Sequence, residues 1–370
     1  MKNIFRQAKG QVIKLDEDIA GLTETAFQAV EALNGGQVLA FPTDTVYGLG
    51  CRADQPQAVK KIYRLKGRSF SKPLILFIKN SRDLSQITRQ IPDYTQKLIN
   101  AYWPGPLTLV FHASDQVKKW GLDKNGTIGV RIPKNEGLQA ILDGLDRPLA
   151  TTSANVSGAT ESWNIQQVME SFKPPVDLIL DGGPLPRCRP STVLDLSREN
   201  PVILRRGDIV RQELVDLLLQ PVKQEKAEVL FVCTGNTCRS PMAAGYLKHI
   251  LPKQWKDRVT VRSCGTSALP GMPATDKGQG AAKKCGFDIS SHHSRTLTDS
   301  LIKQADIIIA LEESHRQDVK KLLPKAQVDL LSVDGVPDPI GGTLDDYAKT
   351  LDLIKREMPD VLKQIKEILA

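Results

Sequence analysis

The sequence predicts an α/β protein made of two domains. Three observations support this prediction. The chain has 370 residues, which is more than one hydrophobic core usually serves. Strand-like and helix-like segments are mixed along most of its length, and their alternation becomes regular only after residue 228. The composition, with 41% hydrophobic and 25% charged residues, is typical of globular proteins.

The expected domain boundary lies in the stretch LLLQPVKQEKAEVL, residues 217–230. A leucine-rich helix end gives way there to Pro221 and a polar, charged run, and such runs mark linkers. We therefore expect a first domain over residues 1–220, a linker over 221–227 and a second domain over 228–370.

The first domain mixes strands with helices and is expected to form an α/β or α+β sheet core. Apolar runs predict strands over 73–79, 105–113, 127–133, 148–158, 191–197 and 201–207, the last two as a hairpin, and residues 37–51 are expected to form a strand that runs into a turn. A helix is predicted over 57–67, because apolar residues recur there at positions 58, 59, 62 and 65.

The second domain alternates strand and helix more regularly. Strands are predicted over 228–233, 258–265, 305–311 and 327–332, and helices from about 241, over 275–285, over 313–323 and over 344–369. This rhythm predicts a doubly wound, four-stranded parallel sheet. Ligands of such sheets bind beyond the carboxyl ends of the strands, where the loop after Val232 lies.

Charge and cysteine usage narrow the class of protein. The net charge of +8 is spread over both halves, which suits anionic substrates but is too diffuse to establish nucleic-acid binding. The six cysteines contain no CxxC pair, and the five histidines show no zinc-like spacing, so no metal site is expected. The sequence shows no signal-peptide pattern and no apolar run of membrane-spanning length. We therefore expect a cytoplasmic protein without a membrane partner.

The stretch VCTGNTCRSP, residues 232–241, has the properties of an anion site. A loop between a strand end and a helix start directs backbone N–H groups and the positive end of the helix dipole at one point. We expect Ser240 as the N-cap and Pro241 as the first helical residue. Gly235 and Asn236 tolerate the left-handed conformations that a ring of amides requires.

Two side chains of this loop suit phosphate chemistry. Cys233 lies at the edge of the anion site, where the thiolate form is expected to be stabilised. Arg239 offers a planar fork that can bind two phosphate oxygens. Asp338, between two prolines in a later loop, is the candidate acid for the leaving group. A redox couple of Cys233 and Cys238, or a purely structural cysteine, are the alternatives that the residues leave open.

The second domain resembles the low-molecular-weight protein tyrosine phosphatase family over about 226–370. The stretch CTGNTCRSPMA, followed by DP-x-GG-x-x-DDY, is most similar to its bacterial arginine phosphatase branch. The resemblance implies that Cys233 is the nucleophile, Arg239 binds phosphate and Asp338 is the general acid. It also implies a set of phosphate-binding and specificity residues without a cofactor: Thr234, Gly235, Asn236, Thr237, Cys238 and Ser240.

Thr237 carries the substrate prediction for this domain. Tyrosine-specific members usually have a larger aliphatic residue there, so the resemblance implies a phosphoarginine protein substrate. Ile340 departs from the branch, which often has an aromatic residue after the Asp-Pro pair. A tyrosine phosphatase stays an alternative, as does a thiol redox switch in which Cys238 forms a reversible disulfide with Cys233. Arsenate reduction is disfavoured because residues 305–330 contain no cysteine.

The first domain contains basic and hydroxyl side chains near predicted strand ends. The basic stretch KGRSFSK covers residues 66–72, and TTSAN covers 151–155, while Arg131 and Arg205 end strands. No GxxxxGK[ST] motif occurs, which excludes a Walker-type nucleotide loop. Any single basic run is usually a solvated face, but several arginines and hydroxyls together favour a polyanion site.

Seven motifs in order give the first domain a resemblance to the YrdC-type threonylcarbamoyl-AMP synthase family, over about 10–215. The motifs are FPTDTVYGLGC, KGRSFSKPL, WPGPLTL, TIGVR, TTSANVSG, PSTVLDL and LRRG. The resemblance implies a twisted α/β sheet with a concave, positively charged cavity. It also implies an enzyme that joins L-threonine, bicarbonate and ATP into threonylcarbamoyl-AMP, with Mg²⁺ assisting. The product would feed t6A modification of tRNA by separate transferase proteins.

Site residues follow from the same resemblance. Those expected to contact threonine are Thr45, Arg131, Thr151 and Ser191. Those expected to hold ATP are Lys66, Arg68, Lys72, Thr127, Ser153, Asn155 and Arg205. Ser69 stands where many members have proline, a change that affects backbone shape rather than chemistry. The alternative for this domain is a non-catalytic RNA-binding module of the same fold. The whole chain is thus interpreted as a bifunctional enzyme.

Overall fold

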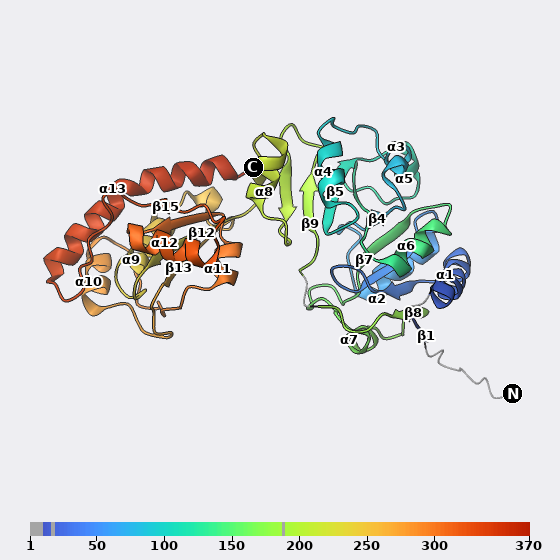
Figure 1. Ribbon diagram of the computed structural model, residues 1–370, viewed down its shortest axis with the longest axis horizontal. Coiled ribbons are helices and arrows are strands. Elements are labelled where there is room, and N and C mark those ends of the chain that lie inside the picture. Colours follow the sequence, from blue (N-terminus) through green and yellow to red (C-terminus); the bar gives the residue numbers. More distant parts are fainter. Residues whose placement is uncertain (1–9, 16–18, 187–188) are drawn as a thin grey trace. The chain divides into compact units, whose positions relative to one another are not determined.

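The structure, a computed structural model, describes residues 10–15, 19–186 and 189–370. It divides into two compact units, Met1–Val222 and Lys223–Ala370 (Figure 1). The division falls inside the segment expected as a linker, and β12 of the second unit already begins at Ala227. No helix among the described residues is both long and apolar enough to cross a membrane.

The first unit is built on a mixed sheet. Its elements in chain order are β1 (Gln11–Lys14), α1 (Ile19–Asn34), β2 (Leu39–Phe41), β3 (Gly48–Arg52), α2 (Pro56–Lys66), β4 (Ile75–Phe77), η1 (Ser81–Asp83), α3 (Leu84–Ile87), α4 (Thr95–Tyr102), β5 (Leu107–His112), α5 (Asp115–Lys119), β6 (Thr127–Arg131), α6 (Glu136–Asp143), β7 (Leu149–Ser153), α7 (Ile165–Ser171), β8 (Leu178–Asp181), β9 (Thr192–Asp195), β10 (Val202–Arg205) and α8 (Arg211–Leu218). Across the sheet the strands run in the order β1-β8-β2-β3-β7-β4-β6-β5-β9-β10.

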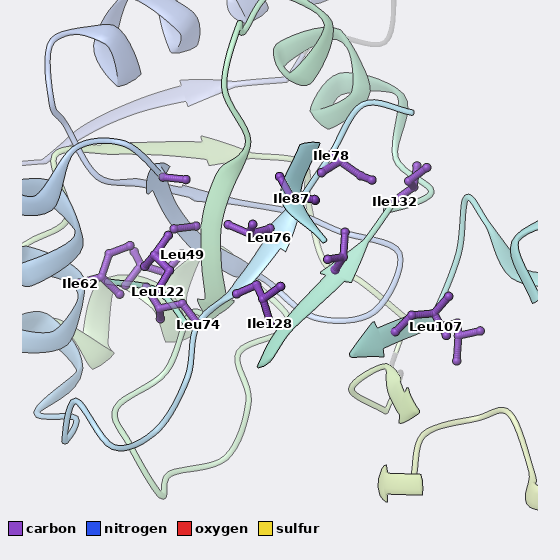
Figure 2. Close-up of a cluster of buried hydrophobic side chains, with 14 of the residues drawn as sticks. Leu49, Ile62, Leu74, Leu76, Ile78, Ile87, Leu107, Leu122, Ile128 and Ile132 are labelled. Atoms are coloured by element: carbon purple, nitrogen blue, oxygen red, sulfur yellow. The ribbon is translucent and has the colours of Figure 1, made fainter. Parts of the chain in front are cut away.

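Alternating side chains give this sheet two buried faces. On β2, Leu39 and Phe41 join a cluster with α1 and α6, whereas Ala40 points to a larger cluster that includes α2. Figure 2 shows part of the larger cluster, with Leu49 and Ile62 among its labelled side chains. This alternation follows from the period of two in strands. Residues 37–51, expected as a strand that runs into a turn, form the antiparallel pair β2 and β3 with a turn of polar residues between them.

The second unit has a four-stranded parallel sheet, as predicted, and its strands lie in the order β13-β12-β14-β15. Its elements are β11 (Lys223–Gln224), β12 (Ala227–Cys233), α9 (Arg239–Ile250), η2 (Lys253–Trp255), β13 (Val259–Gly265), α10 (Asp276–Lys284), α11 (Asp299–Gln304), β14 (Ile307–Ala310), α12 (Glu313–Leu322), β15 (Asp329–Leu330) and α13 (Leu344–Ile368). On β12, Val229 and Phe231 face a cluster with α9 and α13, and Leu230 and Val232 face one with α11 and α12. The sheet is therefore covered on both sides, and its carboxyl end at Cys233 is left for a ligand.

Candidate active sites

In the first unit, polar side chains gather around Arg131, the last residue of β6. Its side chain is only 3% exposed. Its Nη1 donates to Thr45 Oγ1 (3.1 Å), and its Nη2 donates to Asp44 Oδ1 (2.5 Å). Its Nε donates to the carbonyl of Gly105 (2.8 Å). Two of the residues expected to bind threonine, Arg131 and Thr45, are therefore in direct contact.

Ser191 and Arg205 form a second pair of expected site residues. Arg205 Nη2 donates to Ser191 Oγ (3.0 Å), and its Nε donates to the Ser191 carbonyl (3.1 Å). Ser191 Oγ also lies 2.8 Å from Thr108 Oγ1 on β5. Desolvation and the like charge of Arg131 lower the pKa of Arg205, so the two guanidinium groups lie close enough to repel each other.

Lys66, the last residue of α2, is the most enclosed cation of the group and is 1% exposed. Its Nζ donates to the carbonyls of Ser153 and Asn155 and to Asn155 Oδ1. Ser153 Oγ donates to the same Asn155 oxygen (2.6 Å). Burial lowers the pKa of Lys66 to about 7, and the like charges of Arg68 and Lys72 act in the same direction.

The basic segment after α2 is tied to the hydroxyl-rich end of β7. Arg68 Nη1 donates to Thr152 Oγ1 (3.0 Å), and Lys72 Nζ donates to Ser157 Oγ (3.1 Å). The pKa of Arg68 is lowered by burial. The structure thus brings most of the residues expected to hold ATP into one cationic group.

Thr151 and Thr127 occupy different parts of the sheet. Thr151 is buried on β7 two residues before Ser153, so the two side chains share one face of the strand. Thr127 opens β6, and its hydroxyl donates to the carbonyl of Lys124 (2.8 Å) in its own turn. Thr127 lies four positions before Arg131, and four positions correspond to roughly 13 Å along a strand. The structure therefore places Thr127 apart from the group around Arg131.

Sequence reasoning missed Asp44, which directly precedes Thr45. Its Oδ1 accepts hydrogen bonds from Arg131 and from the backbone N–H of Lys134 (3.0 Å). Its Oδ2 is buried and has no hydrogen-bond partner among the described residues. A buried carboxylate oxygen without a partner is unusual and is available to a ligand. Its place in the motif FPTDTVYGLGC, beside an expected site residue, was the available signal.

In the second unit, the loop between β12 and α9 closes around Cys233. Ser240 Oγ lies 2.9 Å from Cys233 Sγ, and the backbone N–H of Asn236 donates to the same sulfur (3.3 Å). Asn236 has a left-handed φ of 54°, and its Nδ2 donates to Ser240 Oγ and Ser263 Oγ, both at 2.9 Å. This network fixes the curvature of the loop around the sulfur atom.

The loop lies directly against the end of β13 at Gly265. A Cβ atom at this residue would lie 2.4 Å from the carbonyl oxygen of Thr234 and 2.9 Å from the backbone nitrogen of Asn236. Both neighbours are backbone atoms of the loop, so a side chain at Gly265 would displace it.

The helix after the loop begins earlier than predicted. α9 starts at Arg239 with Cys238 as its N-cap, so the assignments of Ser240 as N-cap and Pro241 as first helical residue are wrong. The Ser240 hydroxyl contacts Cys233 and Asn236 instead of capping the helix. Pro241 still lies in the first turn, where its missing N–H is tolerated.

Arg239 connects the loop to the expected acid. The side chain is 2% exposed, and its Nη2 donates to Asp338 Oδ2 (2.7 Å) and, at 3.4 Å, to Thr234 Oγ1. Its Nη1 donates to Glu312 Oε2 (2.7 Å). Arg239 and Asp338 are thus brought together as expected, whereas Glu312 was missed. Its position directly after β14, at the carboxyl edge of the sheet, could have revealed it.

Burial raises the pKa of the Cys233 thiol. The hydrogen bonds from Ser240 and Asn236 and the charge of Arg239 act in the opposite direction. The expected stabilisation of the thiolate is therefore outweighed in this state. The physical reason is that Arg239 is already paired with two carboxylates, so that its charge does little to offset the desolvation of the sulfur.

Two further loop residues face the helices that follow. Cys238 is a free thiol, and its Sγ lies 3.3 Å from the phenolic oxygen of Tyr347 and 3.6 Å from Thr275 Oγ1. Thr237 is half-buried, and its carbonyl accepts from the backbone N–H of Thr275 (3.0 Å). Thr234 Oγ1 lies 2.8 Å from Nε2 of the buried His315, whose pKa is lowered by burial.

Comparison with known proteins matches a different family to each unit. The model of the Sua5/YciO/YrdC family, described as "Telomere recombination", matches residues 31–207. The model described as "Low molecular weight phosphotyrosine protein phosphatase" matches residues 228–369. Both matches confirm the families expected from the sequence motifs.

Curated relatives agree with the first match. A threonylcarbamoyl-AMP synthase of Pyrococcus abyssi is 39% identical over 182 residues, which cover 48% of this chain and 53% of that protein. The human threonylcarbamoyl-AMP synthase is 37% identical and is covered to 68%. The enzyme of Vibrio campbellii is 34% identical over 49% of this chain and 97% of its own length. The chain thus spans about half to two thirds of the length of the first two relatives.

Solved structures support the fold. The crystal structure of Pyrococcus abyssi Sua5 complexed with L-threonine superimposes with a TM-score of 0.52 at 22% identity, covering 94% of this chain and 97% of that chain. The chain therefore belongs to the Sua5/YciO/YrdC family through its N-terminal half, and it carries a low molecular weight phosphotyrosine protein phosphatase domain in its C-terminal half.

Proposed function

We propose that the first unit joins L-threonine, bicarbonate and ATP into threonylcarbamoyl-AMP and releases pyrophosphate. The observation that supports this is the set of cations whose side chains donate hydrogen bonds to the side chains of Asn155, Thr152, Ser157, Thr45 and Ser191: Lys66, Arg68, Lys72, Arg131 and Arg205. Such a group is expensive to assemble without an anion, because like charges at short range repel. A triphosphate supplies the missing negative charge, and its transferred and leaving groups would be held by charge-assisted hydrogen bonds.

The two ends of this group suggest a division of roles. Lys66, Arg68, Lys72 and Arg205, with Ser153 and Asn155, would hold the nucleotide and the leaving pyrophosphate. Arg131, Thr45, Thr151 and Ser191 would position threonine, whose carboxylate matches the fork of Arg131. The free Oδ2 of Asp44 could then accept a hydrogen bond from the substrate ammonium group. Because Thr127 lies apart from Arg131, it would at most contact the end of the nucleotide that is farther from the threonine substrate.

Mg²⁺ would reach the site on the phosphates of ATP. Among the described residues, no group of three or more His, Cys, Asp or Glu side chains could hold a metal ion. Mg²⁺ commonly binds through substrate phosphates and few protein ligands, so this donor set is compatible with it. The product would pass to the proteins that complete the t6A modification of tRNA.

ATP–pyrophosphate exchange tests this proposal. We expect exchange by the intact protein to require both threonine and bicarbonate, and Arg205→Gln to lower its rate at subsaturating ATP by about tenfold or more, since a hydrogen bond to a charged group contributes about 1.5–3 kcal/mol. Arg64→Gln, which removes an exposed positive charge from α2, is the matched control. No exchange together with tight tRNA binding would instead support the RNA-binding alternative.

We propose that the second unit is a protein arginine phosphatase. The observation that supports this is the contact of Arg239 with Asp338 beside the loop that surrounds Cys233. In the reaction, a bond forms between Cys233 Sγ and phosphorus while the bond to the leaving nitrogen breaks. Arg239 and the loop amides hold the three phosphoryl oxygens, and Asp338 protonates the leaving group. Water then hydrolyses the phosphocysteine with Asp338 as base.

Substrate choice would depend on Thr237. We expect the parent to hydrolyse phosphoarginine in preference to phosphotyrosine and Thr237→Ile to weaken that preference. The measurement compares kcat/KM for the two substrates in both proteins. Thr260→Ile, which changes an exposed threonine on β13 in the same way, is the control and should keep the parent ratio. A parent that prefers phosphotyrosine would favour the tyrosine phosphatase alternative and overturn the arginine assignment.

The redox-switch alternative is separable from phosphatase activity. Cys238 is a free thiol, and its sulfur contacts the phenolic oxygen of Tyr347 on α13. Replacing Cys238 by serine should leave phosphatase turnover nearly intact. If the same substitution abolished an oxidation-dependent change in synthase activity, the second unit would be a switch rather than a phosphatase.

A further inference from the structure

A second cavity in the C-terminal unit is not used by the proposed phosphatase reaction. Its volume is about 460 Å³, and it lies between α9, β13 and the segment 287–295. Among the described residues, those that line the cavity include Pro241 and later residues of α9, but no residue of the loop 233–239. The volume is within the range of about 300–1,000 Å³ that small-molecule sites occupy.

The floor of this cavity is apolar and partly aromatic. Phe287 and Ile289 are 7% and 5% exposed, and both line it. The ring of His249 lies 5.9 Å from the ring of Phe287, at a tilt of 31°. This surface suits the flat, weakly polar part of an organic molecule, because aromatic rings pack favourably at such distances.

The lining of the cavity carries more positive than negative side chains: Lys248, Arg262 and Arg295 against Asp288, with Arg262 paired to Glu228. Lys248 and Arg295 line the rim of the cavity, and neither side chain makes an ion pair with a described carboxylate. Burial and the like charge of Arg295 lower the pKa of Lys248. The carboxylate on the lining, Asp288, accepts hydrogen bonds from the backbone and side chain of Ser290.

Two histidines lie beside these cations, whereas the positive charge of the rim comes from its lysine and arginine side chains. His292 and His293 also line the cavity, and the pKa of His292 is lowered by burial and by the charges of Arg295, Lys248 and His293. Cations that repel one another around an open cavity are stabilised when an anion binds between them.

We propose that this cavity is a second ligand site that binds an organic phosphate of mononucleotide size. Lys248 and Arg295 would hold the phosphate by charge-assisted hydrogen bonds. The organic part would pack on Phe287 and Ile289. Neither an anion alone nor an uncharged ring alone would use both surfaces.

The proposed site is connected to the catalytic loop by hydrogen bonds to one loop residue, Asn236. His292 Nε2 donates to the backbone carbonyl of Asn236 (2.7 Å), and the backbone N–H of Arg295 donates to Asn236 Oδ1 (2.9 Å). Asn236 in turn donates its backbone N–H to Cys233 Sγ. A ligand at the rim therefore contacts residues that hold the loop in shape from behind.

The five histidines of the chain allow a site-resolved test in the intact protein. His249, His292 and His293 line the cavity, His315 contacts the catalytic loop, and His112 lies on β5 of the first unit. In protein labelled with ¹³C at histidine Cε1, with signals assigned by single His→Gln variants, AMP is titrated, and the His315 signal reports any binding at the catalytic loop. We expect AMP to shift the signals of His249 and His293 in a saturable way.

Charge-removing variants test the residues. Lys248→Gln and Arg295→Gln should each raise the AMP dissociation constant read from the His249 signal by about tenfold, the effect of losing one charge-assisted bond. Lys320→Gln removes an exposed positive charge from α12 and should bind AMP like the parent. Adenosine and inorganic phosphate, each alone, should bind at least about tenfold more weakly than AMP.

Three results would overturn the proposal. AMP could leave the His249 and His293 signals unmoved, or shift only those of His315 or His112, which would place its binding elsewhere. Lys248→Gln and Arg295→Gln could both bind AMP like the parent. Adenosine or phosphate alone could match AMP, which would leave one of the two surfaces without a role. None of these outcomes depends on whether the phosphatase acts on phosphoarginine.

Discussion

At the scale of single residues, the least expected feature is the complete burial of Lys66. The motif KGRSFSK predicted a phosphate-binding lysine, but no pattern in the sequence predicted that it would be 1% exposed or bound to three oxygens of the 153–155 turn. Lysines are almost never fully buried unless they are paired. Glu312 and Asp44 were also missed, although each had a signal in the sequence, because local spacing does not show which carboxylate meets an arginine across the fold.

We predict that Lys66 makes stability depend on pH between about 7 and 10.5. Its pKa is about 7 in the folded chain and near the ordinary lysine value of 10.5 in the unfolded chain, so the unfolded state binds more protons across this window. Stability should therefore rise with pH there, by up to about 1.4 kcal/mol per unit from this residue. Unfolding by urea at several pH values measures the slope, which should be smaller in Lys66→Met.

The control for this slope is Lys60→Met, which removes an exposed lysine from the same helix. Trp103, Trp120 and Trp163 belong to the first unit and Trp255 to the second, so Trp255→Phe protein reports the first unit alone by fluorescence. Equal slopes in Lys66→Met and Lys60→Met would show that Lys66 keeps an ordinary pKa in the folded chain.

At the scale of elements, periodicity predicted the type of most strands and helices, and tertiary contacts set their limits. Over 37–51 the first strand and the turn were predicted, whereas the return strand β3, which pairs antiparallel with β2, was not. The start of α9 was misjudged because Ser240 is a good N-cap in isolation, whereas here its hydroxyl contacts Cys233 and Asn236. The local preference of a residue, such as that of serine for helix capping, is overridden where its side chain has a stronger partner elsewhere in the fold.

The long last helix offers a direct test of element stability. α13 spans Leu344–Ile368 and contains Pro359, which removes one backbone donor from the helix interior. Pro359 is exposed, so Pro359→Ala restores the bond to the carbonyl of Lys355 with little loss of packing. We expect this change to stabilise the second unit by about 1–3 kcal/mol in chemical denaturation followed by Trp255 fluorescence. Asp360→Ala, at the neighbouring exposed position, should change stability by less than about 0.5 kcal/mol, and a Pro359→Ala effect no larger than that would contradict the argument.

At the scale of the whole molecule, two families share one chain while their cores stay separate. Among the described residues, the buried clusters of the first unit end at Val222, and those of the second begin at Ala227. The order of motifs along the sequence predicted this succession, because each motif set is complete within its own half. It could not predict whether one half affects the stability of the other, since that depends on contacts between folded units.

We predict that the two units unfold as separate cooperative transitions. Leu76 and Leu351 are both completely buried, one in each unit, and truncation of a buried leucine to alanine costs about 2–5 kcal/mol. Leu76→Ala should therefore lower only the transition reported by the three tryptophans of the first unit. Leu351→Ala should lower only the transition reported by Trp255. Fragments 1–222 and 223–370, expressed separately, should reproduce the two midpoints. A shift of both transitions by either variant would mean that the units fold as one cooperative body, because the stability lost in one core would then be shared by the other.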